Sequence, residues 1–155
     1  MSVALMLQTT HLGDLEWDSA SEISLPLGLP GFENERRMVP VEVPAQRPLV
    51  YLQSVVNPEI CFVALPVRTI DPAFELVLSD EDRSALSLSE GVPEIGGDVL
   101  CLALLIPDAG SVRVNLDAPI VINLHNSRCV QALSGGESAG CYRLSREGSW
   151  ERTCS

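Results

Sequence analysis

The chain has 155 residues, of which 46% are hydrophobic, and this length and composition predict a single folded domain with a sizeable core. Its 21 acidic residues against 10 basic ones give a formal net charge of −11, which disfavours direct binding to nucleic acid phosphates or anionic membranes. No apolar run is long enough to span a bilayer and no cleavable leader pattern is present, so we expect a cytoplasmic protein, and a monomer.

The predicted elements are almost all short β-strands. Runs rich in β-branched and apolar residues alternate with turns, and the 11 prolines and 11 glycines fall mainly between these runs. The spacing between turns leaves no room for the crossover helices of a parallel sheet. We therefore expect an all-β, mainly antiparallel fold, either a small β-barrel or an orthogonal, barrel-like sandwich. The predicted strands are 3–8, 13–17, 22–25, 37–43, 49–54, 61–65, 75–78, 99–106, 111–116, 120–125 and 129–133.

One short helix is predicted over 79–86 (SDEDRSAL). Ser79 is a favourable N-cap residue, because its hydroxyl can accept a hydrogen bond from a backbone N–H of the first turn. Asp80, Glu81 and Asp82 follow it and complement the positive end of the helix dipole. The acidic triplet therefore has a sufficient structural explanation, whether or not it also binds a partner.

Residues 115–123 (NLDAPIVIN) are strand-like in composition but carry a proline at their centre. Pro119 has no N–H to give to a ladder, and prolines lie in sheets only at edges, strand starts or bulges. We interpret the flanking runs as one ribbon that bends at 117–119. Such a bend lets a continuous segment serve two parts of a barrel or of an orthogonal sandwich.

The C-terminal segment differs from the rest of the chain. Residues 134–140 (SGGESAG) form a polar, glycine-rich run, and the residues beyond about Arg146 show no clear periodicity. We expect a β-barrel domain over 1–133, followed by 134–155 as a C-terminal strand or flexible extension of the same domain.

The sequence contains no recognisable catalytic, cofactor or metal motif. His11 and His125 lie far along the chain from any obvious nucleophile, and we interpret both as surface residues. The five cysteines include no Cys-x-x-Cys pair. A zinc site made by His125, Cys129 and Cys141 is conceivable, but reduced, structural thiols are the better explanation. We therefore predict no catalytic residues, no cofactor and no metal.

Four segments, in this order and at this spacing, resemble the family of flagellar assembly factors called FliW. They are 28–33 (GLPGFE), 52–54 with 57–59 (LQS and NPE), 74–82 (FELVLSDED) and 115–123 (NLDAPIVIN). The resemblance covers about residues 3–133 and fades over 134–155.

The resemblance implies a regulatory binding protein. FliW proteins bind the translational regulator CsrA, a small basic RNA-binding dimer, and relieve its repression of flagellin messenger RNA. They also bind flagellin, and so couple the amount of unexported flagellin to its own synthesis. By this resemblance the expected partners are CsrA and flagellin, without direct contact to nucleic acid or membrane.

We hypothesise that acidic side chains form the surface for CsrA, because complementary charge speeds association with a basic dimer. The candidates are Asp80, Glu81 and Asp82, together with Glu33 and Glu35 in what we expect to be a solvated loop. The competing interpretation is that these carboxylates only complement a helix dipole and keep the protein soluble.

A polar turn supplies a second candidate contact, formed by Gln53, Ser54 and Asn57. Its competing interpretation is a hydrogen-bonded reversal between two strands, set by Asn57 and Pro58.

Two other classes of function stay open. A chaperone-like module would hold flagellin without any effect on CsrA. An enzyme would need a pocket in which His11 or His125 meets a carboxylate or Cys129.

Overall fold

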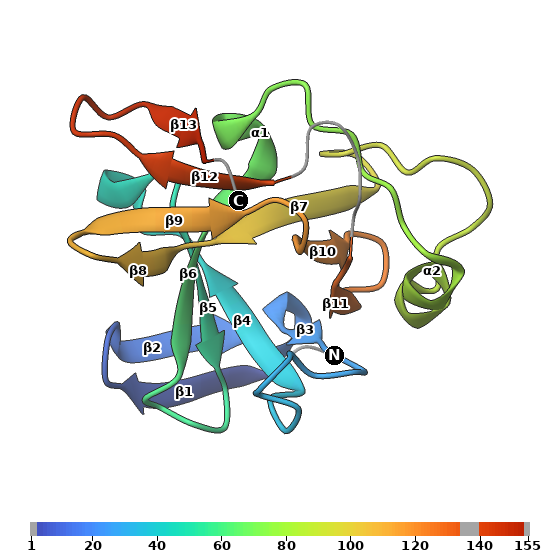
Figure 1. Ribbon diagram of the computed structural model, residues 1–155. Helices are drawn as coiled ribbons and strands as arrows, with labels where there is room; N and C mark the ends of the chain where they lie inside the picture. The colour runs from blue at the N-terminus through green and yellow to red at the C-terminus, as the bar shows by residue number, and fades with distance from the viewer. Residues whose placement is uncertain (1–2, 134–139, 154–155) are drawn as a thin grey trace.

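The computed structural model describes residues 3–133 and 140–153, and within them the chain forms three antiparallel sheets and little helix (Figure 1). This confirms the all-β, mainly antiparallel prediction. The largest sheet has seven strands, in the spatial order β11 (Cys129–Gln131), β10 (Ile120–Asn123), β7 (Val99–Leu104), β6 (Cys61–Pro66), β5 (Val50–Ser54), β4 (Arg37–Val41) and β3 (Ile23–Ser24).

The seven-stranded sheet curls until its two end strands meet. Ser24, in β3, forms a parallel bridge with Arg128, which directly precedes β11. The Ser24 N–H donates to the carbonyl of Ser127 over 2.9 Å. The sheet is therefore a nearly closed barrel with a seam between β3 and β11, which confirms the barrel-like architecture.

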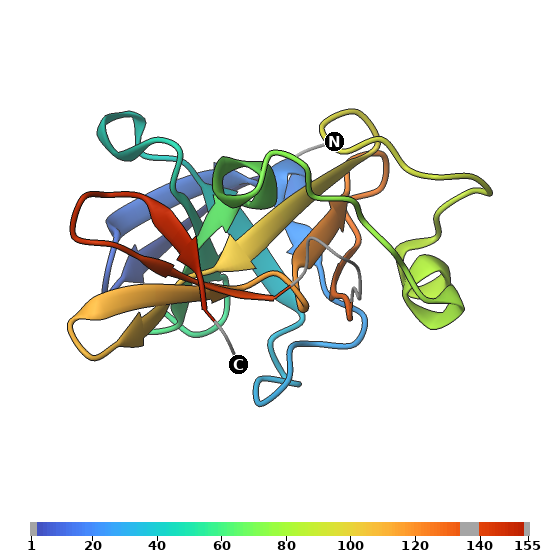
Figure 2. The same ribbon diagram turned by 45° about the horizontal axis from the view of Figure 1, so that its top comes forward.

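A four-stranded sheet lies beside the barrel, in the order β13 (Trp150–Arg152), β12 (Cys141–Leu144), β9 (Ser111–Asn115) and β8 (Ile106–Asp108). Two ribbons pass from one sheet into the other, because β7 continues into β8 and β9 continues through a turn into β10 (Figures 1 and 2). The bend predicted at 117–119 is confirmed as one of these two corners.

The single strand predicted over 99–106 is wrong, because the other ribbon also changes sheets. It divides at Leu105, whose N–H donates to the carbonyl of Val63 in β6 over 2.8 Å. From Ile106 onward the chain pairs with β9 instead. An apolar run gives no sign of the residue at which its pairing partner changes. The sequence pattern therefore predicted one continuous strand where the structure has two.

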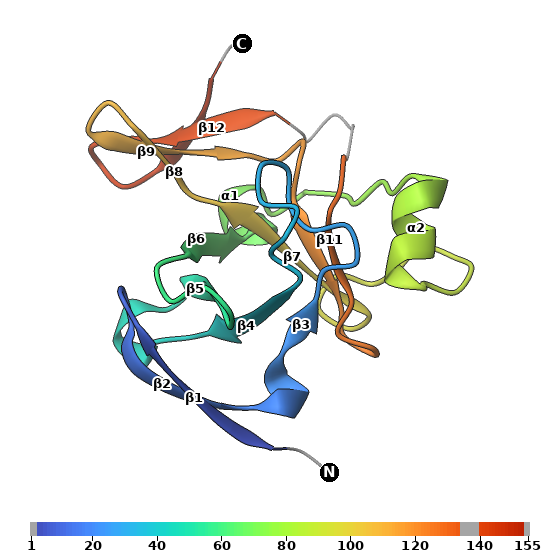
Figure 3. The ribbon, with the colours of Figure 1, turned by 90° about the horizontal axis from the view of Figure 1, so that it is seen from below.

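A third sheet is the hairpin of β1 (Ala4–Thr9) and β2 (Gly13–Asp18), which pair in register from Ala4 with Asp18 to Thr9 with Gly13. The hairpin lies at the side of the barrel away from the four-stranded sheet, as Figure 1 and the view from below in Figure 3 both show.

Two hydrophobic clusters explain why the central strands are apolar throughout. Side chains alternate between the two faces of a strand. On β7 and β10, Leu102 and Ile120 belong to the cluster inside the barrel, whereas Cys101 and Val121 belong to a second cluster outside it. Phe74 joins the outer cluster, so both faces of these strands are buried and leave no place for a polar residue.

Over residues 3–133 and 140–153, helix is confined to short pieces: α1 (Val67–Ile70), α2 (Asp80–Leu86) and two 3-10 turns, Ser19–Ser21 and Pro44–Gln46. The helix predicted over 79–86 is confirmed as α2, and the Ser79 hydroxyl accepts from the Asp82 N–H over 3.1 Å, as expected of an N-cap. In Figure 2, α2 stands at one side of the molecule on long connections.

The strand predicted over 75–78 is wrong, because this segment belongs to none of the sheets. Leu76 and Leu78 pack against the outer cluster, while Glu75 and Val77 are exposed. The alternation of buried and exposed residues in this segment therefore shows only that one side of the chain packs against the core. That pattern is necessary for a half-buried strand, but it does not supply a neighbouring strand.

Several predicted strands end earlier than expected. The strand predicted over 120–125 ends at Asn123, whose side-chain carbonyl accepts from the His125 N–H over 3.0 Å and so begins the reversal. In the C-terminal segment, β12 pairs with β9 and β13 pairs with β12, while 134–139 lies outside the described residues. None of the helices described here has the length and apolarity needed to cross a membrane.

Candidate binding groove beside the acidic helix

The structure divides the predicted contact residues into an exposed acidic set and a buried polar set. Asp80 and Glu81 are exposed in the first turn of α2, and Asp82 is half-buried. Glu33 is also exposed, in the loop between β3 and β4. The other four predicted residues, Glu35, Gln53, Ser54 and Asn57, lie together as a separate cluster.

Glu35 does not lie in a solvated loop, and that expectation is wrong. Its side chain is only 3% exposed. The Ser54 hydroxyl donates to Glu35 Oε2 over 2.5 Å, and the Asn57 amide donates to Glu35 Oε1. Because a carboxylate accepts strong hydrogen bonds, two polar neighbours offset the cost of its burial. Glu35 thus cannot present its charge to a partner in this structure.

Gln53 and Ser54 are fully buried, so neither can serve as a surface contact in this structure. The Gln53 amide nitrogen donates to the carbonyl of Ser54 over 3.0 Å, inside the turn that follows β5. The Ser54 hydroxyl accepts from the Asn57 N–H over 3.0 Å. These bonds match the competing interpretation, a hydrogen-bonded reversal, and Asn57 remains half-buried beside them.

The loop that carries Glu33 is shaped by Gly28. Gly28 has a φ of 66°, and a Cβ added there would lie 2.5 Å from the carbonyl oxygen of Glu33. Only glycine fits so close an approach of two backbone segments. The Glu33 carboxylate accepts from the Gly31 N–H over 3.1 Å, which closes the turn that holds Pro30 at the surface.

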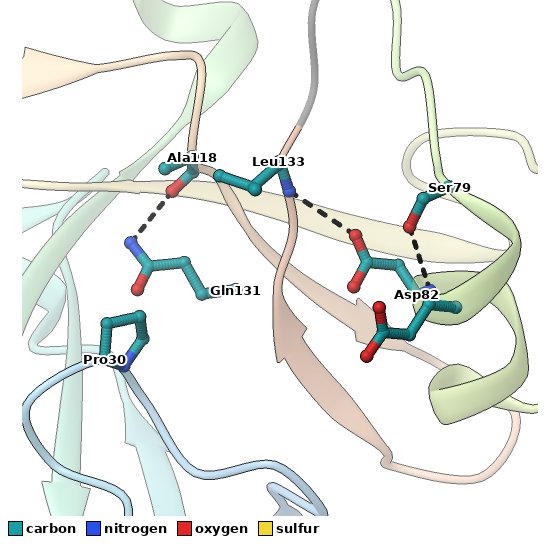
Figure 4. A pocket seen from close by; sticks show the side chains of 7 residues that line it. Pro30, Ser79, Asp82, Ala118, Gln131 and Leu133 are labelled. Carbon is teal, nitrogen blue, oxygen red and sulfur yellow. Dashed lines mark hydrogen bonds between the residues drawn. The ribbon is translucent and has the colours of Figure 1, made fainter.

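A groove of about 580 Å³ opens between this turn and α2 (Figure 4). Figure 4 shows Pro30 and the side chain of Gln131 on one side of the β11 backbone, and Asp82 on the other side. Three of the four segments that carry the family resemblance contribute to its walls. The lining residues are Pro30, Ser79, Glu81, Asp82, Ala118, Gln131 and Leu133.

Side chains from the end of β10 and from the β10–β11 turn fix the position of α2 beside the groove. The carbonyl of Leu86, in the last turn of α2, accepts from the side-chain amides of Asn123 and Asn126, over 2.9 and 3.0 Å. Arg128 Nε donates to the carbonyl of Ala85 over 2.7 Å. The last carbonyls of a helix have no hydrogen-bond donors within the helix. These three side chains supply the missing donors and also anchor the helix to the barrel.

The groove is negatively charged on its α2 side. Glu81 and Asp82 line it, and none of the seven lining residues is basic. The Asp82 carboxylate accepts from the Leu133 N–H over 3.4 Å, a long contact from just beyond the end of β11 (Figure 4). Apolar Pro30, Ala118 and Leu133 complete the surface, and Leu133 is 77% exposed. Such a groove suits a protein segment that combines apolar groups with positive charge.

In the described part of the chain, no group of three or more His, Cys, Asp or Glu side chains is placed to hold a metal ion. The His125 imidazole lies 3.1 Å from Asp98 on the surface, where its side chain is 69% exposed. The Glu94 N–H and the His125 imidazole lower the pKa of Asp98. Cys129 is fully buried, and desolvation raises the pKa of its thiol to about 12, so it is an inert core residue.

Five groove residues were not anticipated as site residues: Pro30, Ser79, Ala118, Gln131 and Leu133. Ser79 had been predicted only as the N-cap of α2. Pro30 and Ala118 lie within segments already singled out, so their motifs were a usable signal. Gln131 offered a weaker one, as a polar residue inside a strand whose neighbours are buried. Leu133 carried no signal, because only the fold brings the end of β11 to α2.

Comparison with known proteins agrees with the resemblance carried by these segments. Residues 6–141 match the model of the family described as FliW protein. The chain is 34% identical to the flagellar assembly factor FliW of Caldicellulosiruptor bescii, over 85% of this chain and 84% of that protein. It is 31% identical to the FliW of Geotalea uraniireducens, over 86% of this chain and 79% of that protein.

A solved structure shares the fold. The crystal structure of a flagellar assembly factor FliW superposes with a TM-score of 0.74 at 25% sequence identity, and the match covers 96% of both chains. The family match and the curated relatives each span most of the chain. The chain therefore belongs to the FliW family of flagellar assembly factors.

Proposed function

We propose that this chain antagonises CsrA: it binds that translational regulator and relieves its repression of flagellin messenger RNA. We also propose that it binds flagellin, which makes it a partner switch in the cytoplasm, and that it catalyses no reaction. Membership of the FliW family carries the proposal, and the relatives are named as assembly factors rather than enzymes.

The charge distribution around α2 supports this function. Asp80 and Glu81 are exposed, and Glu81 and Asp82 line a groove with apolar surface beside them. An acidic surface of this kind attracts a basic partner and speeds the encounter. The exposed acidic residues of α2, together with Glu33 in the β3–β4 loop, form our candidate contact surface for CsrA. The buried cluster of Glu35, Gln53 and Ser54 has no direct part in it.

A two-step experiment tests the proposal. Purified chain is mixed with purified CsrA and with purified flagellin in separate pull-downs, and is then added to CsrA bound to flagellin messenger RNA in a gel-shift assay. We expect both proteins to be retained, and the RNA to be released as the chain is added. Excess flagellin should restore the CsrA–RNA complex if the two partners compete.

The alternative function, a module that holds flagellin alone, predicts a different outcome. Flagellin would be retained in the pull-down, while CsrA would stay bound to its RNA at every concentration of the chain. Retention of neither protein would contradict both functions.

A further inference from the structure

Among the described residues, none pairs with the outer edge of β11 at Gln131. Gln131 faces Ile120 of β10, and the bond that flanks this pair runs from the Ala132 N–H to the Pro119 carbonyl, over 2.9 Å. In an antiparallel ladder such flanking bonds identify a pair of residues that do not bond each other. The Gln131 N–H and C=O therefore point away from β10, and no described residue pairs with either group.

The groove lies on this open side. Leu133, two residues on, points its N–H in the same direction as Gln131, and that N–H donates to Asp82 of α2. At the other end of β11 the edge is closed by the bridge between Ser24 and Arg128. The Gln131 side chain does not cover its own backbone edge, because its amide turns to the carbonyl of Ala118 and donates to it over 3.1 Å (Figure 4).

We propose that the groove receives an extended segment of a protein partner, which adds as a strand to β11 at Gln131 and carries an arginine or lysine toward α2. One residue of the incoming strand would both donate to the Gln131 C=O and accept from its N–H. Its neighbours would contact apolar Pro30, Ala118 and Leu133.

Charge complementarity selects the occupant. Glu81 and Asp82 line the α2 wall and no lining residue is basic, so an acidic segment would be repelled and a cationic one attracted. The open edge favours an extended segment over a helix, because a helix has already used its own backbone groups. The inference rests on the proposed function for the identity of the partner, which is CsrA, because CsrA is the basic one of the two proposed partners.

Two substitutions at Gln131 separate the backbone edge from the side chain. Gln131→Pro removes the outward N–H without breaking a bond to β10, since proline is tolerated where a strand's N–H faces outward. Gln131→Ala removes the same side-chain bond to Ala118 but keeps the N–H, and so is the matched control. Affinities of both variants for intact CsrA and flagellin are measured, with overlapping synthetic peptides from each partner as further probes.

We expect Gln131→Pro to weaken the binding of CsrA by tenfold or more, and Gln131→Ala by less than threefold. A peptide containing Arg or Lys from that partner should bind the wild-type chain and slow hydrogen exchange at the Gln131 amide. The exchange measurement uses the unmodified protein, so it decides the matter even if the proline variant fails to fold.

The outcomes distinguish the two proposals. If the intact partners bind but the Gln131 amide stays unprotected and the two variants bind alike, strand addition is overturned while the proposed function stands. If neither intact partner binds the wild-type chain, the proposed function fails and this inference fails with it. Protection of Gln131 by a peptide that lacks Arg and Lys would overturn the charge requirement.

Discussion

At the scale of single residues, Glu35 shows how a charged side chain can be structural in an acidic protein. Its carboxylate lies inside the fold and ties the β3–β4 loop to the turn after β5 through Ser54 and Asn57. Removal of the carboxylate would leave the Ser54 hydroxyl and the Asn57 amide without their acceptor. A buried donor that lacks an acceptor destabilises the folded state.

We predict that Glu35→Ala lowers the free energy of unfolding by about 2–3 kcal/mol, since hydrogen bonds to charged groups are worth about 1.5–3 kcal/mol. Chemical denaturation of the variant measures this change. Glu75→Ala is the control, because Glu75 is exposed and an exposed change should cost about 0.5 kcal/mol or less. Equal losses in the two variants would contradict a structural role specific to Glu35.

At the scale of elements, Glu22 connects the β1–β2 hairpin to the barrel. Trp17 in β2 donates to Glu22 Oε2 over 2.9 Å, and Arg37 in β4 donates to Oε1 over 2.9 Å. Burial alone would raise the pKa of Glu22, but the hydrogen bonds from Arg37 and Trp17 and the charge of Arg37 lower the pKa overall. The connection therefore depends on an ionised carboxylate.

This link predicts that the hairpin loosens at acidic pH. A carboxyl group with a lowered pKa contributes its full stabilisation above the ordinary glutamate pKa, and the stabilisation is lost as the pH falls through the folded-state pKa. Hydrogen exchange of the Trp17 indole N–H should quicken over that range. Glu22→Gln should show fast exchange already at neutral pH. If the variant matches the wild type at neutral pH, the link is unimportant.

At the scale of the whole molecule, charge acts over a distance. The effect of the acidic residues on α2 on association with CsrA must therefore be distinguished from the effect of the total net charge. The net charge of −11 creates a field on every face, whereas the proposed contact surface is confined to α2 and the groove. Two acidic pairs allow the distinction. Asp80 and Glu81 are exposed on α2, and Asp14 and Glu16 are exposed on β2.

We predict that changing both Asp80 and Glu81 to Arg slows association with CsrA by about tenfold or more at low salt. Changing Asp14 and Glu16 to Arg raises the net charge equally, by two units per residue from −11 to −7, and should slow it by less than about threefold. Stopped-flow kinetics measure both rates. Near 1 M salt, where screening acts over about 3 Å, the difference should shrink.

Thermal melting must first show that the α2 variant is folded, because positive charge in the first helical turn costs about 0.3–1 kcal/mol per residue. Equal association rates for the two folded variants would place the CsrA surface somewhere other than α2.

The candidate site could be predicted from the sequence only in part. The α2 acidic triplet and its Ser79 cap are local features, set by residues within one helical turn, and the structure has them as expected. The misplacement of Glu35 has the opposite cause. A loop rich in charged residues is expected to be solvated. The burial of Glu35 is possible only because Ser54 and Asn57, about 20 residues away, donate hydrogen bonds to its carboxylate.

The sequence by itself determined that the chain is all-β, that a helix begins after Ser79, and that the ribbon bends near Pro119. Each of these follows from side-chain alternation, capping or the missing proline N–H, which are properties of neighbouring residues. Tertiary structure alone decided where β7 passes into β8, why 75–78 is no strand, and that Gln131 faces a groove beside α2. The reason is physical: pairing edges and cavities are made by segments distant in sequence, so no local pattern contains them.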